Sequence, residues 1–167
     1  MLFTAIESTH LKTQTNCEEC LMSDLNVENF VVAITCMDGR IQQAVLNFIK
    51  HRYGAGFIDL ITDIGPNRLL AVKKADFRHG KKTFLDGIWA MFVIKSIRER
   101  LKVSVHKHHA KMFFIVAHDH CAGNPAHKEE QLVHLREAKK TVESFGFRKE
   151  IILLWVKNDW KTVEKVE

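Results

Sequence analysis

The stretch from Val31 to Arg40 has the sequence Val-Val-Ala-Ile-Thr-Cys-Met-Asp-Gly-Arg, and it combines a predicted strand with a candidate site. Its first half is a short apolar run rich in β-branched residues, which is typical of a strand buried in a parallel sheet. A second such run, from Met112 to Ala117, leads directly into His118-Asp119-His120-Cys121. Ligands of open α/β sheets bind beyond the carboxyl ends of the strands. We therefore expect the two motifs to converge although they are far apart in the sequence.

The candidate metal ligands at this edge of the sheet are Cys36, His118 and Cys121. Two thiolates and one imidazole form the soft ligand set that selects Zn²⁺. Each cysteine precedes a predicted helix, whose positive N-terminal dipole favours the thiolate form. Three protein ligands leave the fourth tetrahedral position open, as in catalytic zinc sites, where a bound water has a pKa of about 7.

Asp38 and Arg40 lie two residues apart in the turn after the first strand. At this spacing the guanidinium can orient the carboxylate and keep it ionised. An ionised Asp beside zinc either accepts a hydrogen bond from zinc-bound water or occupies the fourth position itself, and the sequence leaves both open. A purely structural ion pair is the alternative for these two residues. His120 can relay protons or contact an anion, or it can be an exposed residue without a role.

The whole chain, of 167 residues and 46% hydrophobic composition, predicts an N-terminal arm over residues 1–28 and one zinc-binding domain over residues 29–167. Apolar runs predict strands, and 3.6-residue periodicity predicts helices between them. This alternation indicates an α/β fold, a central and mostly parallel sheet with helices on both faces. The strands are expected at 30–35, 57–61, 112–117 and 151–156, and the helices from 41 to a stop at Gly54, from 84 to 101, and from an N-cap at Asn124 to Gly146, with a loop at 63–67.

The composition also bears on location and partners. An apolar leader and a membrane-length apolar run are both absent from the sequence, so we expect a soluble, cytoplasmic protein without a membrane partner. The net charge is +5, but the basic residues are dispersed and no RNA-binding or zinc-finger motif accompanies them, so we expect no specific nucleic-acid partner. Residues 106–109, rich in His, are expected to form an exposed loop rather than a metal site.

Cys17 and Cys20 form a lone Cys-x-x-Cys pair in the polar N-terminal segment. They can be incidental thiols on a helix, a redox pair, or ligands that close a structural zinc site with His118 and Cys121. Four cysteines without a secretory leader favour reduced thiols over disulfides.

The pair of motifs, Cys-x-Asp-x-Arg at 36–40 and His-x-x-Cys at 118–121, resembles the β-class carbonic anhydrases. The resemblance implies a β-carbonic-anhydrase-like fold with Cys36, His118 and Cys121 as zinc ligands and Asp38 and Arg40 as the catalytic pair. It also implies a carbonate dehydratase-like zinc lyase, in which zinc-bound hydroxide attacks CO2 to give bicarbonate, and a homodimer with the active site at the subunit interface.

The sequence departs from the usual pattern of that family at several positions. Ala117 and Ala122 stand where the family usually has Gly, with Gly123 one place later, and the family's loop after the second strand is represented only by residues 63–67. Two alternatives therefore stay open at this point. One is a catalytically weak or inactive zinc-binding member of the same fold, and the other is a hydrolase of a small CO2-like substrate.

Overall fold

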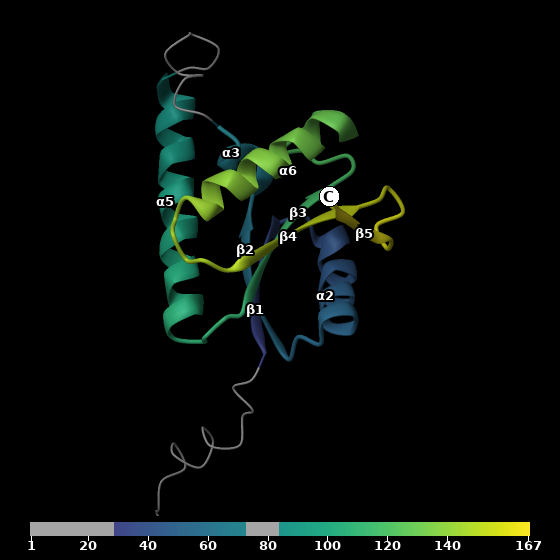
Figure 1. Cartoon of the computed structure of the whole chain (residues 1–167). Helices are drawn as coiled ribbons and strands as arrows, with labels where there is room; N and C mark the ends of the chain where they lie inside the picture. Colours follow the sequence, from purple (N-terminus) through teal and green to yellow (C-terminus); the bar gives the residue numbers. More distant parts are fainter. Residues whose placement is uncertain (1–28, 73–83) are drawn as a thin grey trace, which may run out of the picture.

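The computed structural model describes residues 29–72 and 84–167, and its centre is one five-stranded sheet in the order β2-β1-β3-β4-β5 (Figure 1). The first four strands pair in parallel, and β5 pairs antiparallel with β4. The predicted class, α/β with a mostly parallel sheet, is confirmed. The elements are β1 (Phe30–Cys36), α2 (Gly39–Tyr53), β2 (Phe57–Asp63), α3 (Pro66–Leu70), α5 (Phe84–His106), β3 (Met112–His118), α6 (Lys128–Glu143), β4 (Glu150–Val156) and β5 (Val163–Val166).

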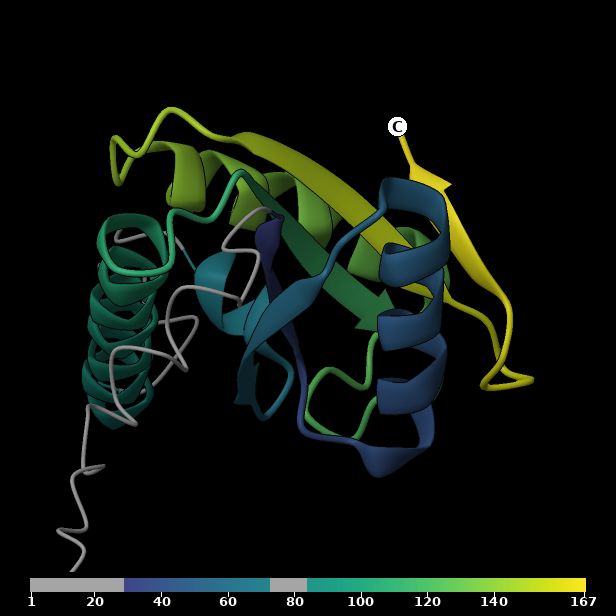
Figure 2. The same cartoon turned by 90° about the horizontal axis from the view of Figure 1, so that it is seen from below.

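Helices cover both faces of the sheet, as expected (Figure 2). Helix α2 lies on one face, and α3, α5 and α6 lie on the other. Successive strand residues point to opposite faces, so β1 contributes Val31 and Ala33 to the core under α2 and Val32 and Ile34 to the other core. Because both faces are covered, β1, β3 and β4 are buried almost throughout, which explains why they appear in the sequence as continuous apolar runs.

Helix α2 begins and ends through local interactions. The Asp38 side chain is the N-cap and accepts a hydrogen bond from the backbone N–H of Arg40. At the other end Gly54 has a left-handed backbone (φ 63°) and donates its N–H to the Lys50 carbonyl, so the predicted stop at Gly54 is confirmed. The helix thus starts two residues after Cys36 and holds the first motif against the sheet edge.

Three predictions about local structure are wrong. Helix α6 begins at Lys128 after His127 and not at Asn124, whose buried side chain instead contacts Gln131 and His134 of that helix. Part of the predicted loop at 63–67 belongs to α3, which has Pro66 at its first position. The strand expected at 151–156, which the sequence pattern predicts to be the last one, is followed by a further strand, β5.

The segment at 106–109 differs in part from the prediction. His106 ends α5 instead of lying in a loop, and His108 Nδ1 lies 2.7 Å from a carboxylate oxygen of Asp59 on β2. The predicted boundary between an arm over 1–28 and a domain over 29–167 stays a prediction, because residues 1–28 lie outside the described part of the chain.

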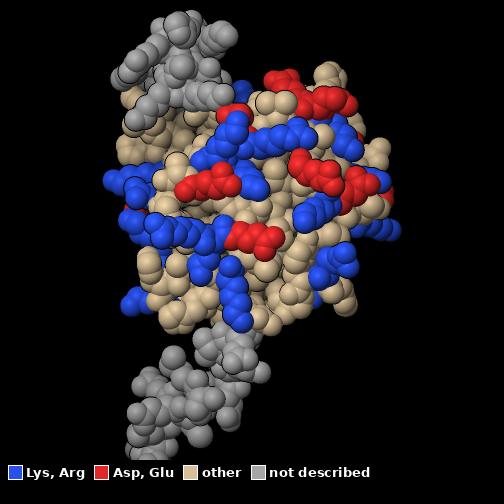
Figure 3. All heavy atoms as spheres, in the orientation of Figure 1, with Lys and Arg blue, Asp and Glu red and all other residues tan. Residues whose placement is uncertain are grey.

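The surface carries both signs of charge. On the face drawn in Figure 3, Lys and Arg side chains alternate with Asp and Glu and do not form one basic stripe. This face agrees with the dispersed pattern predicted for the basic residues. Within residues 29–72 and 84–167, none of the helices is long and apolar enough to span a membrane.

Candidate metal centre

The candidate site lies at the carboxyl edge of the sheet, where β1 ends at Cys36 and β3 ends at His118. The two strands are parallel neighbours, so their last residues emerge side by side. Cys121 lies in the loop that follows β3. All three side chains are buried, and their ligand atoms all lie within 4.8 Å of one another. The structure therefore brings together the three residues that the sequence selected.

The backbone fixes the imidazole of His118. Its Nδ1 lies 2.8 Å from the carbonyl oxygen of Asp119, and because a carbonyl only accepts, Nδ1 carries the proton and donates it. The free lone pair is then on Nε2, which is buried and finds no hydrogen-bond partner in the described part of the chain. Burying such an acceptor costs free energy unless a ligand satisfies it. An imidazole held by a carbonyl at one nitrogen is the usual arrangement of a metal-binding histidine.

The two sulfur atoms are spaced for a shared metal ion. Cys36 Sγ and Cys121 Sγ lie 3.8 Å apart, and both cysteines are free. Two sulfurs bound to one tetrahedral Zn²⁺ at about 2.3 Å each are separated by about 3.8 Å. The distance and the donor types therefore fit zinc, as does the unsatisfied Nε2 of His118.

Electrostatics links the ionisation of the two thiols. A hydrogen bond from Cys121 lowers the pKa of Cys36, and the backbone N–H groups of Gly65 and Asp38 lower it further. The same hydrogen bond raises the pKa of Cys121, together with burial and the negative charge on Cys36. Two buried thiolates at this separation repel each other, and a bound dication removes that repulsion. The site therefore favours a divalent cation.

Asp38 and Arg40 form a hydrogen-bonded ion pair beside the three donors. Arg40 Nε donates to Asp38 Oδ1 at 3.0 Å, and Nη2 donates to Oδ2 at 2.5 Å. These bonds lower the pKa of Asp38 to about 2, so the carboxylate is ionised at neutral pH. Among the described residues, the group of three ligand atoms does not include an oxygen of Asp38. Arg40 instead holds that carboxylate.

Two glycines join the loops that carry the site. A Cβ atom on Gly65 would lie 2.6 Å from the carbonyl carbon of Gly123, and one on Gly123 would lie 2.6 Å from the Gly65 nitrogen. Gly65 also has φ of 54°, a left-handed conformation that favours glycine. The loop after β2 therefore presses directly on the loop that contains Cys121, and only residues without a side chain permit this contact.

Comparison with protein-family models gives one family, described as "Putative carbonic anhydrase", over residues 26–85 and 80–167. The chain belongs to this family. The matched residues include the three metal-ligand candidates and the Asp38–Arg40 pair, which lie at the positions described above.

This member of the carbonic anhydrase family was also compared with solved structures and with curated proteins. A solved structure that it resembles is the β-carbonic anhydrase isoform I of the protozoan Trichomonas vaginalis. The two are 16% identical, the match covers 80% of each chain, and the TM-score is 0.46. Comparison with curated proteins gives no match.

The sequence analysis did not identify one side chain that lies near the candidate site. Trp160, in the turn between β4 and β5, has its ring centroid 6.1 Å from that of His118 and 3.9 Å from Cζ of Arg40. Three residues separate it from Val156, where β4 reaches the same edge of the sheet. That spacing is the signal that could have found it, but the strand after Trp160 was not predicted.

The remaining residues singled out from the sequence have different positions. The side chain of His120 is exposed, and its ring centroid lies 6.3 Å from that of Trp160. Cys17 and Cys20 lie outside the described residues, so their proposed roles stay hypotheses.

Proposed function

We propose that this protein is a zinc-dependent hydratase that converts CO2 to bicarbonate, with Cys36, His118 and Cys121 as the metal ligands. The observation that carries the proposal is the buried group of three donors, with its 3.8 Å sulfur separation and the unsatisfied Nε2 of His118. Membership of a carbonic anhydrase family supports the choice of reaction. The proposed catalytic activity is supported by the Asp38–Arg40 ion pair, which lies beside the three donors.

In this proposal the metal supplies a Lewis acid that lowers the pKa of a bound water to about 7. Asp38 accepts a hydrogen bond from the attacking water and thereby orients its lone pair toward the carbon of CO2. Arg40 keeps the Asp38 carboxylate ionised and fixed, because it donates to both of its oxygens. Asp38 is therefore proposed as an orienting acceptor and not as a fourth ligand, because the group of ligand atoms found among the described residues contains no Asp38 oxygen.

The metal part of the proposal is tested by the zinc content of the purified chain and by titration against a chromophoric chelator. One tightly bound zinc per chain is expected. A folded chain that binds no zinc contradicts the proposal at its first step, before any assay of turnover.

The reaction is tested by stopped-flow CO2 hydration from about pH 6 to about pH 9, the range in which such a water ionises. The expected result is a rate above buffer that Asp38→Asn lowers by about 100-fold, within the range lost with a positioned acid–base group. A zinc-loaded, folded chain with no rate above buffer contradicts hydration and leaves a zinc-binding member of the same fold. CO2 or bicarbonate is the small-molecule partner of this protein only if hydration above the buffer rate is measured.

We further propose a homodimer. Helix α5 exposes three large apolar side chains, Trp89, Met91 and Phe92, each about three-fifths accessible. Trp89 and Phe92 are three residues apart and so lie on the same face of the helix, and exposed apolar surface of this kind marks interaction sites. Sedimentation velocity is expected to give a dimer that Phe92→Glu dissociates, whereas a monomer in both samples contradicts the proposal.

A further inference from the structure

The turn between β4 and β5 is held by the side chain of Asp159 together with backbone hydrogen bonds from Lys157 N–H to the Thr162 carbonyl and from Trp160 N–H to the Lys157 carbonyl. Asp159 accepts hydrogen bonds from the backbone N–H groups of Lys161, at 3.0 Å, and Thr162, at 2.8 Å. Its second oxygen accepts from the Thr162 hydroxyl, and these bonds lower the pKa of Asp159 to about 2. Trp160 is thereby held with φ of 59°, a left-handed conformation that a bulky side chain rarely adopts. Such strain persists where surrounding contacts determine the conformation, and it is common near functional sites.

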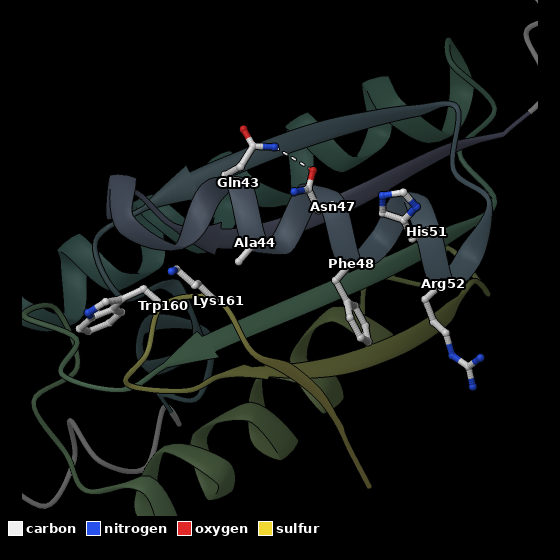
Figure 4. Close-up of a pocket in the computed structure, with 8 residues that line it drawn as sticks. All are labelled: Gln43, Ala44, Asn47, Phe48, His51, Arg52, Trp160 and Lys161. Atoms are coloured by element: carbon white, nitrogen blue, oxygen red, sulfur yellow. Dashed lines mark hydrogen bonds between the residues drawn. The ribbon is translucent and has the colours of Figure 1, made fainter.

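The strained turn aims the indole of Trp160 at the metal-centre residues. Figure 4 shows this side chain near the beginning of α2, while Phe48 lies farther along the same helix. The guanidinium carbon of Arg40 lies 3.9 Å from the ring centroid, which is cation–π contact. The rings of His118 and His120 lie 6.1 and 6.3 Å away. One aromatic side chain therefore touches both the ion pair and a candidate ligand.

The guanidinium of Arg40 uses its edge and its face for different contacts. The edge donates to Asp38 and the face rests on Trp160. The Arg40 side chain is 51% exposed, and exposed ion pairs contribute little because both side chains stay mobile. Stacking on an indole restricts that motion and stabilises the guanidinium at an exposed site. The ring therefore supports the guanidinium on the face that is not used for Asp38, while the Arg40 backbone N–H donates to Asp38 independently of it.

We propose that Trp160 is a positioning residue, which fixes Arg40 by stacking and thereby fixes the carboxylate of Asp38 beside the three metal-binding donors. The catalytic consequence rests on the proposed hydratase function, whereas the placement of Arg40 by Trp160 does not. The β4–β5 hairpin, which lies outside both sequence motifs, thereby contributes a residue that positions the candidate site.

The placement is tested by NMR of the metal-free protein with ¹⁵N-labelled arginine, in which Arg40→Lys identifies the Arg40 Nε–H signal. In the wild-type protein the ring current of Trp160 is expected to shift this signal upfield. Trp160→Leu is expected to abolish the shift and to speed exchange of Nε–H with water by about two- to fivefold, which corresponds to the loss of the stacking contact. Trp160→Phe, which keeps an aromatic face, is expected to retain part of both effects.

Phe57→Leu is the control, because Phe57 is an exposed aromatic residue at the amino end of β2, at the opposite edge of the sheet from the candidate site. It is expected to leave the Arg40 signal unchanged. Urea unfolding of each variant separates local loosening from loss of the fold. An Arg40 signal that is unchanged in a folded Trp160→Leu protein overturns the proposal.

The functional arm uses zinc affinity, CO2 hydration and a double-mutant cycle. Trp160→Leu is expected to lower kcat by about tenfold, since small misplacements of catalytic groups have effects of this size or larger, while zinc affinity changes less than threefold. Because Trp160 acts through Arg40, adding Trp160→Leu to Arg40→Gln is expected to cause no further loss. Additive losses overturn the positioning role. A wild-type protein with no hydration contradicts the proposed function instead, and the NMR experiment still decides the placement of Arg40.

Discussion

Two chain segments of different construction carry the candidate metal centre, one at the end of β1 and one at and after the end of β3. Residues 37–38 join β1 to α2, and Asp38 caps the helix and binds Arg40, so its contacts lie within the motif itself. Residues 119–127 join β3 to α6 and contact distant partners, among them Gly65, whose backbone packs against Gly123 without room for a Cβ atom. The comparison teaches that one half of the site is specified locally and the other half by tertiary packing. The experiments below test that difference.

The largest expected effect comes from removing either sulfur, the one at the end of β1 or the one in the loop after β3. Cys36→Ser and Cys121→Ser are each expected to weaken zinc binding by more than about 100-fold, because a lost ligand costs more than a lost outer contact. Competition with a chromophoric chelator measures this.

Cys17→Ser and Cys20→Ser are the controls and are expected to retain one equivalent of zinc. Loss of zinc from Cys17→Ser would instead support a closed site that includes the N-terminal thiols. Unequal effects of the two main variants would show that the loops do not contribute equally.

The contact between loops is broken by adding a methyl group. Gly123→Ala is expected to lower the free energy of unfolding by about 1–3 kcal/mol, because its Cβ would overlap backbone atoms of the loop after β2. Gly65→Ala is expected to cost about 2–4 kcal/mol, since it adds strain from φ of 54°. Urea unfolding measures both.

Gly39→Ala is the matched control on the short loop's helix, because no atom lies within 4 Å of its Cβ position. It is expected to stabilise the protein by at most about 1 kcal/mol through helix propensity. Equal losses at all three glycines would contradict the tertiary origin of the contact.

The local loop is tested at its cap. Asp38→Ala is expected to lower the free energy of unfolding by about 1–2 kcal/mol, because it removes the acceptor for the Arg40 N–H and the ion pair. Asp38→Asn keeps a capping oxygen and is expected to lose less. An alanine variant as stable as the asparagine variant would show that the cap contributes nothing.

The same carboxylate gives a pH dependence with a defined sign. The pKa of Asp38 is about 2 in the folded chain and 3.8 in the unfolded chain, so the unfolded chain binds the proton more tightly. The stabilisation by Asp38 is therefore present above about pH 4 and is lost as the pH falls through about 2. Urea unfolding of metal-free wild-type and Asp38→Asn proteins across this range is expected to show a difference that disappears at low pH.

The smallest expected effect comes from giving α6 a side-chain N-cap like the one that Asp38 provides for α2. His127, the N-cap of α6, makes no side-chain capping bond. His127→Asp is expected to raise the free energy of unfolding by about 0.5–1 kcal/mol, through a capping bond and a favourable charge at the helix start. A thermal melt measures the gain, and His127→Ala controls for simple removal of histidine.

Features set by neighbouring residues could be predicted from the sequence. The apolar runs of β1 and β3, the stop of α2 at Gly54 and the convergence of Cys36 with Cys121 follow from strand burial, glycine conformation and the geometry of parallel sheets. These rules act over a few residues or apply to every sheet of this class.

Features set by distant contacts could not be predicted. Asn124 followed by Pro125 resembles a helix start, but its side chain binds Gln131 and His134 instead of capping the backbone. β5 is a four-residue edge strand with little apolar patterning, and pairing with β4 defines it. Trp160 enters the site only because this hairpin closes.

The position of the two cysteines in the chain has a consequence for biosynthesis. Cys36 and Cys121 are separated by 85 residues, and ribosomes add about 5–20 residues per second, so the first sulfur leaves the ribosome about 4–17 s before the second. During that interval the nascent chain holds one of the three donors, since His118 also comes late. If the proposed zinc binding holds, the complete set of three donors becomes available only after β3 has been made and has paired with β1, and a truncated product ending before Met112 lacks two of the three donors.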